Sequence, residues 1–260
     1  MNEALFHALN GLVGRSWLVD SLIALALDNL LVKAGPICAC FLYAWYRSAD
    51  GSPDRRARRI LLVTLAALFV IAPVSKSLSE TRLAPRPFLM AEQAYALDDG
   101  RLTASAPMPF RTMQSGEMMD RVAEVQEGRV AANDLVTFPS DHAAFFFALA
   151  LGIFLACRRA GIIALAWALV VTLGSRVAAG MHWPLDIAAG AALGAAVLLA
   201  LIFALARRPW RIWDAVLGWI ERRPGLTAAL LFMILLEAAN TMQTLKRVME
   251  LASTLAGRLL

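Results

Sequence analysis

Long apolar stretches constrain the fold of this chain more than any other feature of its sequence. A helix needs about 20 mostly apolar residues to cross the hydrocarbon core of a bilayer. Five stretches, each bounded by charged or helix-breaking residues, approach this length: Leu30–Tyr46, Ile60–Leu78, Ala143–Cys157, Gly161–Leu173 and Leu185–Ala206. A sixth, Leu226–Ala239, is weaker because it contains Glu237. Hydrophobic residues make up 59% of the chain, against roughly 45–50% in soluble domains. We therefore expect an all-α integral membrane protein, a bundle of about six transmembrane helices, with five as the alternative.

The basic residues outside these stretches predict how the chain is oriented. Arginines follow the first, third and fifth stretches, which places them on one side of the membrane: Arg47, Arg55, Arg56, Arg58, Arg59, Arg158, Arg159, Arg207, Arg208, Arg211, Arg222 and Arg223. By the positive-inside rule this side is cytoplasmic. We expect a multi-pass membrane protein whose third and fifth spans begin at the outer face, which in a bacterial inner membrane is the periplasmic face. Nucleic acid is not an expected partner of the +5 net charge, because the basic residues lie in loops and form no stripe with interleaved aromatics.

The remaining segments complete a single membrane domain over residues 1–260. We expect interfacial helices in 1–29, since Asp20 and Asp28 interrupt their apolar pattern. The first two spans occupy 30–87, a periplasmic insertion 88–134, three further spans 135–206 and C-terminal helices 207–260. A cleavable signal peptide is not expected, because the first basic residue is Arg15.

The periplasmic insertion contains one helix-like run, Gly116–Glu127. Five of its residues share an apolar stripe at helical spacing: Met118, Met119, Val122, Val125 and Gln126. The simpler interpretation is a surface helix. The alternative is a lid over the path by which a lipid reaches the site.

Polar residues gather at the outer ends of the predicted spans. In the first group Lys76, Arg82 and Arg86 follow the second span. In the second group, Pro139 to His142, we expect Ser140 to be the N-cap of the third span and Asp141 to lie in its first turn. The free N–H groups of such a helix end bind anions, and His142 would lie beside the anion. A capped helix with a nearby histidine is also a common structural feature, so this interpretation stays open.

The third group surrounds the turn between the fourth and fifth spans. Arg176 ends the fourth span, Gly180 breaks it, and Pro184 suits the first turn of the fifth. His182 then lies in the turn, with Asp186 four residues later and within reach of one imidazole nitrogen. A carboxylate placed there fixes the tautomer of the histidine and leaves its other nitrogen free as a nucleophile. The alternative is an interfacial histidine beside a snorkelling arginine.

The chemistry that these residues suggest is phosphoryl transfer. This reaction spreads negative charge over three oxygens, which arginine forks, a lysine and helix N–H groups complement. We expect neither a metal nor another cofactor, because the sequence has no ligand spacing of the kind that zinc prefers and no carboxylate-rich loop for magnesium. Cys38, Cys40 and Cys157 lie in or at the ends of apolar stretches and are expected to be free.

Together the three groups resemble the type 2 phosphatidic acid phosphatase superfamily, whose motifs are Lys-x6-Arg-Pro, Pro-Ser-Gly-His and Ser-Arg-x5-His-x3-Asp. The third motif is matched in full from Ser175 to Asp186. The resemblance implies that His182 is the nucleophile and forms a phosphohistidine, that Asp186 orients it, and that His142 protonates the leaving oxygen. It also implies the residues that hold the phosphate: Lys76, Arg86, Ser140, Asp141 through its backbone, and Arg176.

Two positions depart from the family pattern. Asp141 replaces a glycine, and its carboxylate would repel phosphate unless the side chain turns away. Nine residues separate Lys76 from Arg86 instead of six, which sets Lys76 about 4.5 Å farther back along a helix. Arg82 is the alternative for its role.

The sequence Pro-Ser-Asp-His looks like that of the bacterial undecaprenyl-diphosphate phosphatase branch. We therefore expect metal-independent removal of phosphate from a lipid phosphate or diphosphate, with undecaprenyl diphosphate as the first candidate. Phosphatidylglycerol phosphate, phosphatidic acid and a lipid A phosphate are alternative substrates, and a phosphotransferase is an alternative activity. A non-catalytic transporter of lipid phosphates and a vanadium-dependent haloperoxidase are alternatives of other classes. The oligomeric state is left open.

Overall fold

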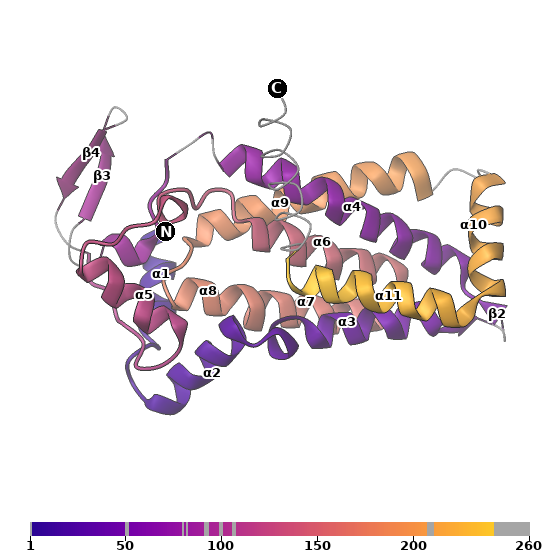
Figure 1. Cartoon of the computed structure of the whole chain (residues 1–260), viewed down its shortest axis with the longest axis horizontal. Helices are drawn as coiled ribbons and strands as arrows, with labels where there is room; N and C mark the ends of the chain where they lie inside the picture. The colour runs from indigo at the N-terminus through magenta and orange to yellow at the C-terminus, as the bar shows by residue number, and fades with distance from the viewer. Residues whose placement is uncertain are drawn as a thin grey trace, which may run out of the picture.

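The computed structural model describes residues 2–49, 52–79, 81, 83–90, 94–98, 101–105, 108–206 and 211–241. Its body is a bundle of long helices, with a smaller cap of helices and loops at one end (Figure 1). The bundle helices are α3 (Leu30–Tyr46), α4 (Arg55–Ser79), α6 (Asp141–Ala156), α7 (Arg158–Trp167), α8 (Gly174–Ala178), α9 (Pro184–Leu201) and α11 (Pro224–Ala239). The cap holds α1 (Asn2–Asn10), α2 (Trp17–Asp28), η1 (Pro87–Met90), the hairpin β3 (Ala94–Asp98) and β4 (Arg101–Ser105), α5 (Glu117–Gln126) and η2 (Ala132–Asp134).

Three helices are long and apolar enough to cross a membrane: Arg55–Ser79, Arg158–Ala178 and Pro184–Leu205. The second of these runs through α7, the π-helical turn η3 (Ala168–Leu173) and α8 without a break. The helices α2 and α3 pass the same test together, but they meet at an angle of 62°, as in a broken span or a re-entrant loop. The helices α6 and α11 are apolar but shorter. The expectation of an all-α membrane protein is confirmed, while the number of spans stays a prediction.

The helix α6 lies at the centre of the bundle and packs against α4, α7 and α9. Phe145, Phe146 and Leu149 are almost fully buried there. Two glycines allow α9 to approach closely, because a Cβ on Gly190 would lie 2.2 Å from the Ser140 carbonyl oxygen and one on Gly194 would lie 2.1 Å from that of Ala144. Small residues at such contacts let two helix backbones meet in a membrane. This contact holds the start of α6 against the start of α9.

The cap contains most of the predicted insertion. Its helix α5 confirms the helical run expected at Gly116–Glu127. Met118 and Val122 are buried as the stripe predicts, but Met119 and Gln126 are exposed and so do not belong to it. The β3–β4 hairpin was not expected from the sequence. Whether the cap acts as a lid stays a prediction.

The arginine-rich loops lie at the opposite end of the bundle from the cap. There the short pair β1 (Ser48–Ala49) and β2 (Ser52–Pro53) joins α3 to α4. The helix α9 ends close by in the π-helical turn η4 (Ile202–Ala206), and α10 (Arg211–Arg222) lies across the bundle end (Figure 1). The predicted clustering of basic residues on one side agrees with this arrangement, within the residues that the structure describes. Arg82, Arg207 and Arg208 lie outside them.

Candidate active site

A cavity of about 350 Å³ opens where the second, third and fifth predicted spans reach the cap. It brings together residues from all three polar groups of the sequence: Lys76, Arg86, Asp141, His142, Arg176 and His182, with Thr137 beside them. Side chains more than 100 residues apart in the chain therefore share one site. Asp186 and Ser140 lie directly behind its wall and are buried.

The central contact of the cavity is a chain of hydrogen bonds through Thr137. The Thr137 hydroxyl donates to Asp186 Oδ2 at 2.7 Å and lies 2.7 Å from His182 Nδ1. Because the hydroxyl proton is used on the carboxylate, Thr137 Oγ accepts from His182, whose Nδ1 therefore carries the proton. The Nε2 atom of His182 is left with a free lone pair, as a nucleophile requires.

The expected direct hydrogen bond between His182 and the Asp186 carboxylate is thus replaced by one bridged through Thr137. The Asp186 Oδ2 to His182 Nδ1 distance is 3.8 Å, too long for a hydrogen bond. The same carboxylate oxygen accepts the backbone N–H of Trp183 at 2.8 Å, which ties it to the first turn of α9. Asp186 still fixes the tautomer, but through Thr137.

Thr137 is placed by an extended segment that pairs with the loop after α4. The Thr137 N–H donates to the Ala84 carbonyl at 3.0 Å, and the Ala84 N–H donates to the Leu135 carbonyl at 2.7 Å. Sequence analysis missed Thr137. Its position two residues before Pro139 was the only available signal.

Burial controls the charge of His182, which is 3% exposed. Burial lowers the pKa of its imidazole below the ordinary value, and the nearby arginines act in the same direction while Asp186 opposes them. The histidine is therefore neutral at neutral pH. A neutral imidazole with Nδ1 protonated has a free lone pair on Nε2 and is the form that can act as a nucleophile.

The second histidine has its own carboxylate. His142 Nδ1 lies 2.8 Å from Asp141 Oδ1, and the same oxygen accepts the His142 backbone N–H at 2.7 Å. This contact fixes the orientation of the His142 imidazole. The Asp141 side chain is thus turned onto the histidine, although it still lines the cavity.

Two buried arginines supply positive charge. Arg176 is 4% exposed, and its Nε has no hydrogen-bond partner within the described part of the chain. A buried donor left in this state is costly unless a ligand accepts from it. Arg86 is held by the carbonyls of Asn133 (3.1 Å) and Met181 (3.0 Å) and lies 3.9 Å from the Asp134 carboxylate.

The other predicted phosphate ligands are placed differently. Lys76 lies in the last turn of α4 and lines the cavity in spite of its unusual spacing from Arg86. Ser140 is fully buried and accepts the Ala143 N–H at 3.3 Å, which confirms it as the N-cap of α6. Its role toward phosphate stays a prediction, as does that of the Asp141 backbone.

The sequence pattern of the PAP2 superfamily matches residues 57–211, which hold every residue described above. The chain belongs to the PAP2 superfamily. This confirms the resemblance drawn from the motifs, and PAP2 proteins are phosphatases that act on lipid phosphates. The three free cysteines lie outside the cavity.

A curated relative adds a second comparison. The chain is 48% identical over 65 residues to the bacitracin transport permease protein BcrC of Bacillus licheniformis. The matched residues make up 25% of this chain and 30% of the relative. Less than a third of the relative is therefore matched. No solved structure matches the chain. Among the described residues, no group of three or more His, Cys, Asp or Glu side chains is arranged to hold a metal ion.

Proposed function

We propose that this PAP2 protein is a metal-independent phosphatase that removes phosphate from a lipid phosphate or diphosphate by way of a phosphohistidine. The observation that supports this most is the bridged His182–Thr137–Asp186 contact in a cavity that also holds Arg176, whose Nε is unsatisfied among the described residues. A site that only bound phosphate would need the cations. It would have little use for a histidine held in one tautomer.

In the first step His182 Nε2 attacks the phosphorus atom. A P–N bond forms as the P–O bond to the lipid breaks, and His142 gives its proton to the departing oxygen. Arg86, Arg176 and Lys76 neutralise the charge on the other phosphoryl oxygens. As His182 becomes positive, Asp186 stabilises it through Thr137.

In the second step water replaces the histidine. His142, now neutral, takes a proton from the water molecule while the water oxygen attacks phosphorus. The P–N bond breaks, inorganic phosphate leaves, and both histidines return to their starting states. A phosphotransferase would differ only here, with a lipid hydroxyl in the place of water.

Undecaprenyl diphosphate is our first candidate substrate. Its isoprenoid chain can stay in the bilayer while its charged head reaches the cavity at the helix ends. The sequence Pro139-Ser140-Asp141-His142 and the similarity to BcrC support this choice. We place the protein in a bacterial inner membrane with the cavity facing the periplasm, because the arginine-rich end is the opposite one.

The test is phosphate release by purified protein in detergent from a panel of lipid phosphates, with a chelator present. The panel contains undecaprenyl diphosphate, phosphatidylglycerol phosphate, phosphatidic acid and a lipid A phosphate. We expect release by wild type and none by His182→Ala, which should still bind the lipid. His7→Ala is the matched control, since His7 lies outside the cavity and packs against Phe6.

Each alternative has its own outcome. Binding without release from any lipid would favour a transporter, in keeping with the word permease in the name of BcrC. Release that stops with chelator would contradict the metal-free mechanism. Loss of substrate phosphate without free phosphate, with label appearing in a second lipid, would indicate a phosphotransferase.

A further inference from the structure

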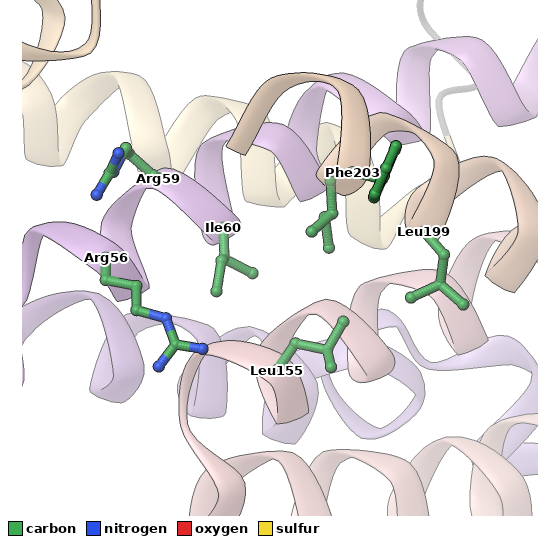
Figure 2. A pocket seen from close by; sticks show the side chains of 7 residues that line it. Arg56, Arg59, Ile60, Leu155, Leu199 and Phe203 are labelled. Carbon is green, nitrogen blue, oxygen red and sulfur yellow. The ribbon is translucent and has the colours of Figure 1, made fainter. Parts of the chain in front are cut away.

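A second and larger cavity, of about 690 Å³, lies at the arginine-rich end of the bundle. Figure 2 shows side chains of α4, α6 and α9 around it, including Arg56, Ile60, Leu155 and Leu199. On α4, Arg59 of this cavity and Lys76 of the active site are 17 positions apart, or about 25 Å along the helix. It is therefore a separate cavity at the opposite membrane face.

The arginines of this cavity differ from their neighbours in charge pairing. Arg47 pairs with Asp54 at 2.9 Å and Arg55 pairs with Glu221 at 2.6 Å. Arg56 and Arg59 line the cavity, and neither forms an ion pair with any residue that the structure describes. Their positive charge is thus available to an anion in the cavity.

The rest of the cavity is lined by apolar side chains. Leu199 of α9 is 47% exposed and Phe203 of η4 is 66% exposed. Ile60 forms the inner wall and is buried. Figure 2 shows the Arg56 side chain reaching toward Leu155, so that charge and apolar surface lie next to each other.

The helix α10 indicates the depth of this cavity in the membrane. It lies across the bundle end, and its Trp213 donates from Nε1 to the Leu205 carbonyl at 3.0 Å, two residues beyond Phe203. Tryptophans concentrate at the level of lipid headgroups. The cavity therefore extends from the headgroup level into the acyl-chain region.

We propose that this cavity binds one anionic phospholipid of the adjacent leaflet. Its phosphate would contact Arg56 and Arg59, and its acyl chains would lie along Leu155, Leu199 and Phe203. A membrane-facing arrangement of two uncompensated arginines above apolar walls matches a lipid with a negative head better than it matches a soluble anion or a neutral lipid. This inference does not depend on the reaction proposed for the other face.

The test is native mass spectrometry of the purified protein with phosphatidylglycerol or phosphatidylcholine. We expect one tightly held phosphatidylglycerol. In Arg56→Gln/Arg59→Gln its affinity should fall about 30-fold, since each arginine near an anionic membrane surface contributes about 1 kcal/mol. Arg158→Gln/Arg159→Gln is the matched control, because it removes the same charge at the same end from two exposed residues outside the cavity.

A second variant, Leu155→Trp, fills the apolar part and keeps both arginines. It should lose phosphatidylglycerol while its melting temperature stays close to that of wild type. Equal binding of phosphatidylcholine, equal loss in the Arg158/Arg159 control, or undiminished binding by Leu155→Trp would overturn the proposal. Competition by millimolar inorganic phosphate that leaves no lipid bound would also overturn it, since the site would then be one for a free anion.

Discussion

The bridging hydroxyl of Thr137 is the feature of the proposed mechanism most open to test. Thr137→Val keeps the shape of the side chain and removes the hydroxyl. His182 Nδ1 then has no acceptor at 2.7 Å, and its nearest carboxylate oxygen is 3.8 Å away. Asp186 Oδ2 keeps only the Trp183 N–H. The variant therefore isolates the bridge from the rest of the site.

The size of the effect follows from one hydrogen bond in a charged network. Such a bond contributes about 1.5–3 kcal/mol, and His182 needs it most when it becomes positive in the transition state. We expect kcat to fall roughly 10- to 150-fold. KM should change little, because Thr137 is uncharged and is not one of the residues proposed to bind the phosphate. Thr137→Ser keeps the hydroxyl and should stay within a few-fold of wild type.

The assay is steady-state phosphate release together with rapid-quench measurement of phosphohistidine formation. Slowed formation of the phosphoenzyme in Thr137→Val would place the defect at the attack by His182. A merely structural role would instead lower the melting temperature and affect valine and serine variants alike. A kcat within two-fold of wild type for Thr137→Val would refute the bridge.

Three further predictions concern the same site and its support. Arg176→Lys removes the unsatisfied Nε donor and the planar fork, and should lower kcat/KM at least tenfold in the same release assay. Because burial lowers the pKa of His182, the neutral nucleophile persists as pH falls. In wild type, the acid limb of kcat/KM for phosphate release should therefore lie below the ordinary histidine value of 6.5. A limb above that value would contradict the burial argument. Gly194→Ala places a Cβ 2.1 Å from the Ala144 carbonyl oxygen and should destabilise the protein by about 1–3 kcal/mol, seen as a lower melting temperature in detergent, whereas Gly218→Ala, where a Cβ meets nothing within 4 Å, should not.

Local signals in the sequence were sufficient to predict the ends of the helices. Ser140 does cap α6, Pro184 does begin α9, and Gly180 has a φ of +78° after α8. Each is a residue whose own backbone or side-chain chemistry favours one place at a helix end. Residues attached to those ends, His142 and His182 among them, were therefore found as well.

The number of residues between Lys76 and Arg86 was a poorer guide to the site than the ends of the helices. The α4 helix continues to Ser79, so that Lys76 stays within its last turn and still lines the cavity with Arg86. The cavity could be inferred from the ends of the helices more reliably than from the number of residues between them.

Thr137 could not be predicted for a different reason. It lies on neither a helix nor a periodic strand, and its place depends on pairing with Ala84, 53 residues earlier in the chain. No local pattern encodes such a contact. The same segment brings the Asn133 carbonyl to Arg86, so that it positions both His182, through Thr137, and Arg86 at the cavity.

The four arginines at the start of α4 show what the sequence alone can and cannot predict about charged residues. Positions 55 and 58 share one face of the helix and positions 56 and 59 share the next, since residues three apart are neighbours. From the sequence all four arginines serve equally well to mark a cytoplasmic side. The structure distinguishes them because Glu221 of α10 lies beside Arg55 and Arg58, which leaves the charges of the other face uncompensated above an apolar cavity. The same helix that presents Lys76 to the candidate active site therefore presents, at its other end, arginines suited to hold a lipid of the opposite leaflet.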